Sequence, residues 1–173
     1  MAIALNGSTN VITPVSAVQP TGAILQVVQT VKTDTFSLTS TADFADITGL
    51  SVNITPSSTS SKILVMLYLV VGSGNIPTTR IMRDSTAIGI GDAAGDRIQC
   101  TTGGYSIPNN YLSGAGTAVF LDSPSTTSQI TYKAQLSPEH SSHTVYINRS
   151  PNDTDNYQGY RSISTITVME VSG

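Results

Sequence analysis

The sequence has little charge. Only 11% of its 173 residues are Asp, Glu, Lys or Arg, less than half the usual quarter. Glu and Lys, both good helix formers, occur two and three times. The net charge is −3. This argues against non-specific nucleic-acid binding, which needs basic side chains to neutralise phosphates, and against binding to an anionic membrane surface.

Cysteine, tryptophan and long hydrophobic runs are also scarce. The single cysteine, Cys100, excludes a disulfide within the chain and a cysteine metal site. The longest apolar run, residues 63–71, is far shorter than the roughly 20 residues of a membrane helix. It predicts a central strand buried on both faces and no membrane insertion. The first ten residues lack a basic start and an apolar stretch, so no signal peptide is expected.

Hydroxyl residues are abundant instead. The chain has 23 Ser and 24 Thr, yet 39% of its residues are hydrophobic, which excludes a disordered chain. Four Asn-x-Ser/Thr triplets follow from this hydroxyl content and carry no further prediction; they begin at Asn6, Asn53, Asn148 and Asn152. Val, Ile, Thr and Tyr recur throughout, a composition typical of strands.

The apolar pattern predicts many short strands with turns between them. Leu50, Val52 and Ile54 alternate with polar residues, which indicates a strand with one buried face. Predicted strands cover residues 23–32, 35–39, 50–54, 62–71, 79–83, 87–90, 97–101, 116–122, 129–136, 144–148 and 162–171, with loops at 91–110 and 151–159. We therefore expect an all-β fold, an antiparallel β-sandwich of jelly-roll type spanning residues 22–173. Residues 1–21 carry no charge and predict an extended N-terminal arm.

No pattern indicates catalysis. The chain has no Gly-x-Ser-x-Gly nucleophile elbow. His140 and His143 stand in a polar run that predicts solvated loop histidines, and no third ligand for a zinc or iron ion is evident. Glycoside hydrolysis needs two carboxylates at a defined separation, but only Glu139 and Glu170 are glutamates and the aspartates are scattered in loops. We expect no enzyme and no cofactor.

Two loops contain paired aspartates. Asp92 and Asp96 stand in one loop, and Asp153 and Asp155 in another. Oxygen-rich loops suit Ca²⁺, and of the two pairs Asp153 and Asp155 are the preferred calcium candidates. Neither loop has the spacing of an EF-hand, and Asp is an ordinary turn residue. The sequence therefore predicts no metal site beyond that candidate pair.

Aromatic and amide side chains gather in two loops. Loops on a rigid sandwich often bind partners, and exposed aromatic residues with Asn and Arg suit a cell-surface receptor. The alternative is that the tyrosines are buried between subunits or beneath the loops. Candidate receptor contacts are Tyr105, Asn109, Asn110, Tyr111, Asn156, Tyr157, Tyr160 and Arg161.

Sparse charge also favours an oligomer, because a neutral surface suits close packing with identical neighbours, whereas a soluble single chain usually has more charge.

Several phrases resemble a known family. MAIALNGSTN (residues 1–10) resembles the start of small virion fibre proteins of cyanophages and other phages of aquatic bacteria. Further phrases resemble the C-terminal domains of their tail fibres: LQVVQTVKTDTFSL (25–38), TGLSVNITPSSTSSKILV (48–65), AVFLDSPSTTSQITY (118–132), NR (148–149), DTDN (153–156) and STITVMEV (164–171). The resemblance covers nearly all of the chain after residue 22.

The resemblance implies a homotrimeric jelly roll similar to tumour-necrosis-factor-like and complement C1q-like heads. Such a protein would be made in the bacterial host cytoplasm and carried on the virion surface. Its arm would dock to other virion proteins, and its loops would bind a host surface glycan or protein as a short tail fibre or tail-associated tip. The short segment before the domain disfavours a long fibre. A capsid decoration trimer is the alternative, and a secreted carbohydrate-binding module a more distant one.

Overall fold

The computed structural model describes residues 3–5, 12–14, 19–39, 44–73, 76–103, 114–138, 143–157 and 159–173, with side chains described from residue 19 onward. Within these ranges the chain forms strands and no helix. The strands are β1 (Ile3–Leu5), β2 (Ile12–Pro14), β3 (Ile24–Lys32), β4 (Phe36–Thr39), β5 (Ala45–Ile54), β6 (Lys62–Gly72), β7 (Thr78–Arg83), β8 (Thr86–Ile88), β9 (Thr102–Gly103), β10 (Gly114–Asp122), β11 (Ile130–Ser137), β12 (Thr144–Ile147) and β13 (Ser164–Val171).

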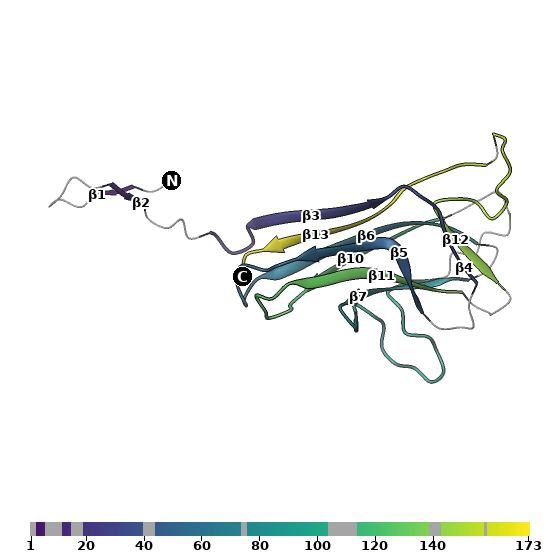
Figure 1. Ribbon diagram of the computed structural model, residues 1–173. Coiled ribbons are helices and arrows are strands. Elements are labelled where there is room, and N and C mark those ends of the chain that lie inside the picture. The colour runs from purple at the N-terminus through teal and green to yellow at the C-terminus, as the bar shows by residue number, and fades with distance from the viewer. Residues whose placement is uncertain are drawn as a thin grey trace.

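The strands form a two-layered sandwich (Figure 1). The first sheet has the order β3-β13-β6-β12-β4, and β10 pairs with the free side of β6. The second sheet has the order β5-β11-β7-β8, with β9 added to β7. All pairs are antiparallel. Because β3 pairs with the last strand, and β5, β6 and β7 alternate between sheets, the arrangement is the jelly roll that the sequence predicts.

The sandwich has two distinct ends. At the proximal end β3 begins and β13 finishes, joined by backbone hydrogen bonds from Gly22 to Ser172 (2.8 Å) and from Ser172 to Ala23 (2.8 Å). At the distal end the long loop 149–163 connects β12 to β13 (Figure 1). Near the chain start, β1 and β2 pair antiparallel with each other and belong to neither sheet of the sandwich.

The core lies between the two sheets. Alternate residues of each strand point inward, as the period of two predicts. Burial of each Leu or Ile side chain contributes about 1.5–3 kcal/mol. The most deeply buried side chains include Tyr132, Leu50, Ile63, Leu69, Ile81, Leu136, Ile147 and Ile166.

Two carboxylates are buried at the proximal end. Glu170, 1% exposed, accepts hydrogen bonds from the backbone N–H (2.7 Å) and Oγ (2.6 Å) of Ser57 and from Gln26 Nε2 (2.6 Å). Burial raises the pKa of Glu170, but the bonds from Ser57 and Gln26 outweigh it and lower the pKa to about 2. Asp122 accepts from Arg83 (2.9 Å) and from the hydroxyl of buried Tyr132 (2.7 Å), which ties the two sheets together.

Two sequence expectations are wrong. The first is that residues 62–71 are buried on both faces: Met66 and Tyr68 are each 39% exposed, because none of the described elements covers the outer side of β6. The second is a strand at 97–101. Only Thr101 reaches β7, where it donates its N–H to Thr79 (2.8 Å), and strand pairing begins at Thr102.

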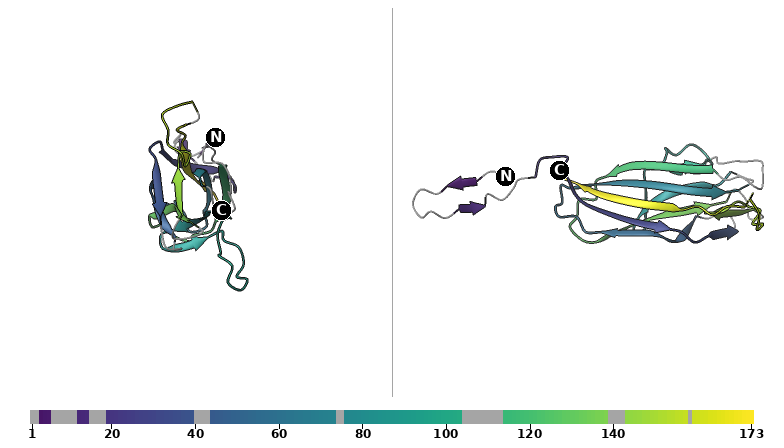
Figure 2. Two further views of the ribbon diagram at one scale, coloured as in Figure 1. Left: turned by 90° about the vertical axis from the view of Figure 1, so that its right-hand side faces the viewer. Right: turned by 90° about the horizontal axis from the view of Figure 1, so that it is seen from above.

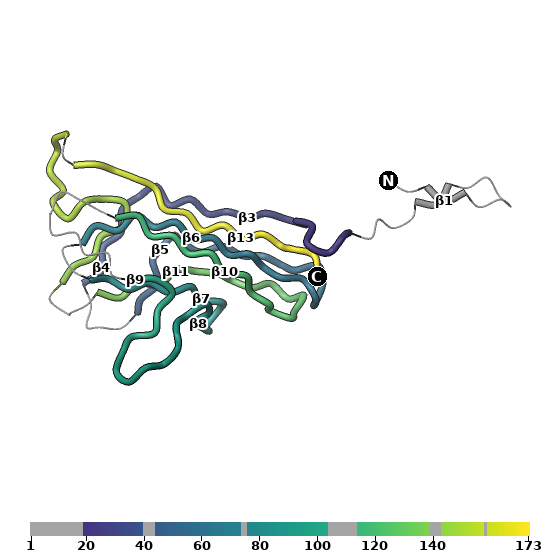
Figure 3. Tube along the Cα trace, turned by 180° about the vertical axis from the view of Figure 1, so that it is seen from behind, coloured from purple at the N-terminus to yellow at the C-terminus, as the bar shows by residue number. Residues whose placement is uncertain are grey.

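Residues 89–101 instead form a loop that projects from the edge of the second sheet (Figure 3). The strand predicted at 87–90 is Thr86–Ile88 and stops at Gly89. Gly89 has a φ of +58°, and a Cβ there would come within 2.9 Å of the Phe120 ring. A side chain is therefore excluded at that position.

Candidate functional site

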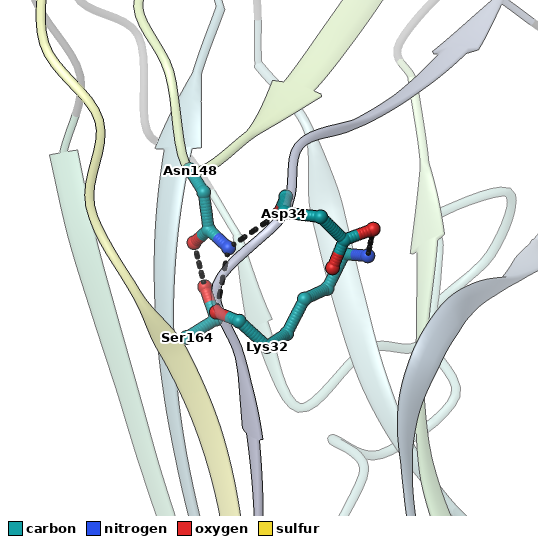
Figure 4. Close-up of polar contacts among 4 residues, drawn as sticks. All are labelled: Lys32, Asp34, Asn148 and Ser164. Atoms are coloured by element: carbon teal, nitrogen blue, oxygen red, sulfur yellow. Dashed lines mark hydrogen bonds and ion pairs between the residues drawn. The ribbon is translucent and has the colours of Figure 1, made fainter.

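Asn148 supports the distal loop 149–163 from below. It is fully buried in the left-handed backbone region (φ +64°), which Asn tolerates better than most residues. Its Nδ2 donates to the carbonyl oxygens of Lys32 and Asp34, both at 2.9 Å, and its Oδ1 accepts from Ser164 Oγ at 2.7 Å (Figure 4). Asn148 therefore joins the ends of β3, β12 and β13 where the loop leaves the sandwich.

An ion pair lies beside Asn148 at the base of the loop. The buried Nζ of Lys32 lies 2.8 Å from Asp34 Oδ2 (Figure 4). The hydrogen bond from Lys32 lowers the pKa of Asp34. A Cβ at Gly72 would collide with the carbonyl oxygen of Arg149, so the end of β6 must be a glycine for the loop to begin where it does.

Above this base the loop borders an open hollow of about 320 Å³. The loop closes on itself through backbone bonds from Asn156 to Thr154 (2.9 Å) and from Gly159 to Asn156 (3.0 Å). A Cβ at Gly159 would collide with the Thr154 carbonyl oxygen, so this closure requires glycine. The hollow is lined by Asp153, Thr154, Asp155, Asn156, Gly159, Tyr160 and Arg161. We call this set the distal hollow.

Asp153 fixes one wall of the distal hollow. Its Oδ1 lies 2.5 Å from Arg161 Nη1 and its Oδ2 lies 3.2 Å from Arg149 Nη1. The Arg161 bond, aided by the charge of Arg149, lowers the pKa of Asp153, so this carboxylate is ionised at neutral pH. Arg149 also stacks 4.0 Å from the Tyr146 ring centre, and it forms a β-bridge with Arg161. The wall is thus held from both ends of the loop.

The structure brings part of the predicted receptor contacts together. Asn156, Tyr160 and Arg161 line the distal hollow, and Tyr157 lies on the same loop with 94% of its surface exposed. The other four predicted contacts lie outside the described residues; they are Tyr105, Asn109, Asn110 and Tyr111.

The calcium candidates Asp153 and Asp155 both line the hollow. Within the described ranges no three His, Cys, Asp or Glu side chains gather closely enough to hold a metal ion. Asp92 and Asp96 lie on the projecting loop 89–101, and His143 lies just before β12, whereas His140 and Glu139 fall in a range that is not described. In the described part of the chain no helix is long and apolar enough to cross a membrane.

Sequence reasoning missed what shapes the hollow. Asn148 stood out only as the start of an Asn-x-Ser triplet, and its buried side chain instead makes three hydrogen bonds. Gly159 gave no signal beyond its place in a polar loop, since its role depends on how closely Thr154 approaches it.

A second candidate surface is the outer side of the first sheet. Cross-strand pairing places its residues in three rows across β3, β13, β6 and β10. The exposed members include Val119 at 64% and Val27 at 55%. A shallow groove of about 360 Å³ crosses the middle row. We call this surface the apolar face; it consists of Val27, Gln29, Val31, Leu64, Met66, Tyr68, Thr117, Val119, Leu121, Thr165, Thr167 and Met169, none of them charged.

The outer side of the second sheet is polar. Asp46 accepts from Lys133 Nζ (2.7 Å) and Gln135 Nε2 (2.7 Å), and Arg80 donates to Gln135 (2.8 Å) while stacking on the Phe44 ring (4.1 Å). Burial raises the pKa of Asp46, but the hydrogen bonds from Lys133 and Gln135 outweigh burial, so the pKa lies below its ordinary value. We call this surface the polar face.

No protein-family model and no curated protein matches the chain. Solved structures with some likeness include that of infectious bursal disease virus Gt strain, at 13% identity and a TM-score of 0.47 over 100% of this chain and 42% of that chain. The crystal structure of the infectious bursal disease virus VP2 subviral particle is similar at 12% identity and a TM-score of 0.47, over 99% and 42%. The chain thus spans about two fifths of the length of these chains.

Proposed function

We propose that the chain is a structural protein of a bacteriophage virion that assembles as a homotrimer and binds the host cell surface. It would act as a short tail fibre or tail-associated tip, by binding and without catalysis. The sequence phrases that resemble phage fibre proteins supply the virion setting and the number of copies. The structure supplies the surface that such an assembly needs.

The apolar face is the observation that carries this proposal. Monomeric soluble proteins rarely expose large contiguous apolar patches, and larger ones mark interaction surfaces. Here none of the twelve residues of the face is charged, and Val27, Met66, Tyr68, Val119 and Leu121 are each more than a third exposed. A neutral, rigid strand surface of this kind suits burial against copies of itself, because interface cores are depleted in charge.

The two ends of the sandwich supply a direction. Residues 19–23 lead into β3 at the proximal end, and the loop between β12 and β13 lies at the other end of the strands (Figures 1 and 2). That loop forms the distal hollow. A trimer anchored by its arms would therefore present three distal loops away from the particle. Three sites per trimer and many trimers per virion raise the effective concentration, so weak single contacts give firm attachment.

The first test is the mass of the purified chain in solution. Sedimentation equilibrium should give about three times the chain mass of 18.1 kDa. A species of one chain mass at micromolar concentration contradicts the proposed assembly.

The second test is the position of the protein on intact phage particles, by antibody labelling under electron microscopy. Label at the tail end supports the fibre or tip. Label spread over the head would replace it with the capsid decoration trimer, and the host-binding part of the proposal would fall.

A further inference from the structure

The charges around the distal hollow cancel. Asp153 and Asp155 contribute two negative charges, and Arg149 and Arg161 contribute two positive ones that both pair with Asp153. Among the described residues around the hollow, no surplus positive charge remains for a phosphate, sulfate or carboxylate ligand. The single carboxylate of Asp155 is also a weak basis for a cation, since oxygen-coordinated cations need several ligands.

The lining is built from residues that carry hydrogen-bonding groups. It offers carboxylate and amide oxygens, hydroxyl groups, a guanidinium group and backbone, and it includes no Leu, Ile, Val, Met or Phe side chain. A lipid or an apolar side chain could make no hydrogen bond with these groups. The groups match a ligand whose closely spaced hydroxyls both donate and accept.

Aromatic surface is present beside these polar groups. Tyr160 lines the hollow, and Tyr157 stands almost fully exposed on the same loop. A tyrosine ring offers a flat apolar surface next to a polar tip, which suits the C–H face of a sugar ring. The volume of about 320 Å³ lies at the small end of ligand pockets, which run from about 300 to 1,000 Å³.

We infer that the distal hollow binds a neutral sugar unit of a surface glycan, with Asp155 and Asn156 hydrogen-bonding its hydroxyls and a tyrosine ring packing on its face. The inference rests on the proposed function, because it assigns the ligand class of the loops that the proposed trimer presents outward. The Arg149–Asp153–Arg161 pairing is the frame that holds the wall in place, so its charges are already engaged before any ligand arrives.

Saturation-transfer NMR on the full chain tests this directly. The probes are the methyl glycosides of glucose, galactose, mannose and N-acetylglucosamine, set against sialic acid, glucose 6-sulfate and glucosamine. We expect transfer to at least one neutral glycoside and none to the charged sugars. Binding should not change when NaCl is raised from about 0.1 M to about 0.5 M, since screening acts on charges.

Variants locate the site. Asp155→Ala and Asn156→Ala should each lower the affinity for the bound glycoside by about tenfold, because each removes a hydrogen bond from a charged or polar group. Gly159→Ala should abolish binding because it displaces the Thr154 backbone without changing charge. Asp92→Ala is the matched control, an exposed aspartate on the separate loop 89–101 that should leave binding unchanged.

Failure here is distinguishable from failure of the proposed function. A trimer found on particles that binds none of these sugars, or only the anionic ones, overturns the sugar inference and leaves the virion assignment standing, with a protein receptor as the remaining occupant. Sugar binding that survives all three hollow variants also overturns it. A monomer that binds the glycoside through the hollow would reject the assembly and keep the sugar site.

Discussion

The two outer faces of the sandwich differ sharply although the same chain builds both. The polar face exposes Asp46, Lys133 and Arg80 in a hydrogen-bonded lattice. The apolar face exposes valine, methionine, leucine and tyrosine and has no charge in its three rows. The solvent-facing side of an antiparallel sheet normally carries polar residues. The polar face therefore has the chemistry of a solvated surface, whereas the apolar face has the chemistry of a surface that packs against a partner.

The inner side of the first sheet differs from its outer side in charge. In the first sheet the charged side chains of Lys32 and Glu170 point inward beside the hydrophobic core and are 3% and 1% exposed. Each buried charge is held by hydrogen bonds or an ion pair, as burial of charge requires. The first sheet therefore holds buried charged side chains on its inner side, whereas the three rows of the apolar face hold none.

A lysine placed on each face gives the largest expected contrast. Thr117→Lys puts a charge on the exposed apolar face, and the proposed trimer would bury it without a partner at a cost of several kcal/mol. We expect the trimer to dissociate to single chains of 18.1 kDa in sedimentation equilibrium. Thr48→Lys, on the exposed part of β5, should leave the mass unchanged.

Equal masses for the two variants would remove the distinction between the faces. Thr117 is exposed in the single chain, so an intact far-ultraviolet spectrum will show that Thr117→Lys still folds. If the variant chain folds but does not form the trimer, the substitution acts on the interface and not on folding.

Residues 62–71 show what a sequence can and cannot disclose here. The unbroken apolar run at 63–71 predicted burial on both faces, yet the described residues cover only the side that faces the second sheet. The prediction is wrong for the single chain, and the exposed side chains of Met66 and Tyr68 motivate the proposed trimer.

The fold was more predictable than the site. Periods of two in β5 and β11 follow from local side-chain chemistry, so strand positions could be anticipated to within a few residues. The distal hollow depends on Asn148 meeting Lys32 and Asp34 across more than a hundred residues. Such long-range closures leave no periodic pattern. The sequence predicted the candidate contacts in this loop from their residue types alone, and only the structure shows that three of them line one hollow.

Asn148→Ala should cause the next largest effect, on stability. It removes three buried hydrogen bonds and leaves alanine in a left-handed backbone, which together should cost about 3 kcal/mol. Urea unfolding followed by circular dichroism measures the loss. Asn53→Ala on the polar face, where Asn53 accepts one exposed bond from Thr131, should cost about 0.5 kcal/mol or less. Similar losses for both would contradict the role of Asn148 as the loop's base.

Glu170 predicts how the first sheet responds to acid. Its folded pKa of about 2 lies below the ordinary 4.5, so its ionised form stabilises the fold above pH 4.5, and this stabilisation is lost as the pH falls from 4.5 towards 2. We expect Glu170→Gln to lower the free energy of unfolding by about 2 kcal/mol at pH 6. The gap between wild type and variant should narrow by pH 3. A gap that does not change with pH would mean that the charge of Glu170 does not stabilise the fold.

The Lys133–Asp46 pair on the polar face should have the smallest effect. Both side chains are partly exposed, at 26% and 50%, and exposed ion pairs contribute about 0.2–1 kcal/mol. A double-mutant cycle with Lys133→Ala and Asp46→Ala should give a coupling in that range, and the coupling should shrink as salt screens the charges. A salt-insensitive coupling of several kcal/mol would mean that this pair is desolvated. The polar face would then also be buried in the assembly. The two faces would differ in the chemistry of the interfaces that they form, and not in whether they face solvent or a partner.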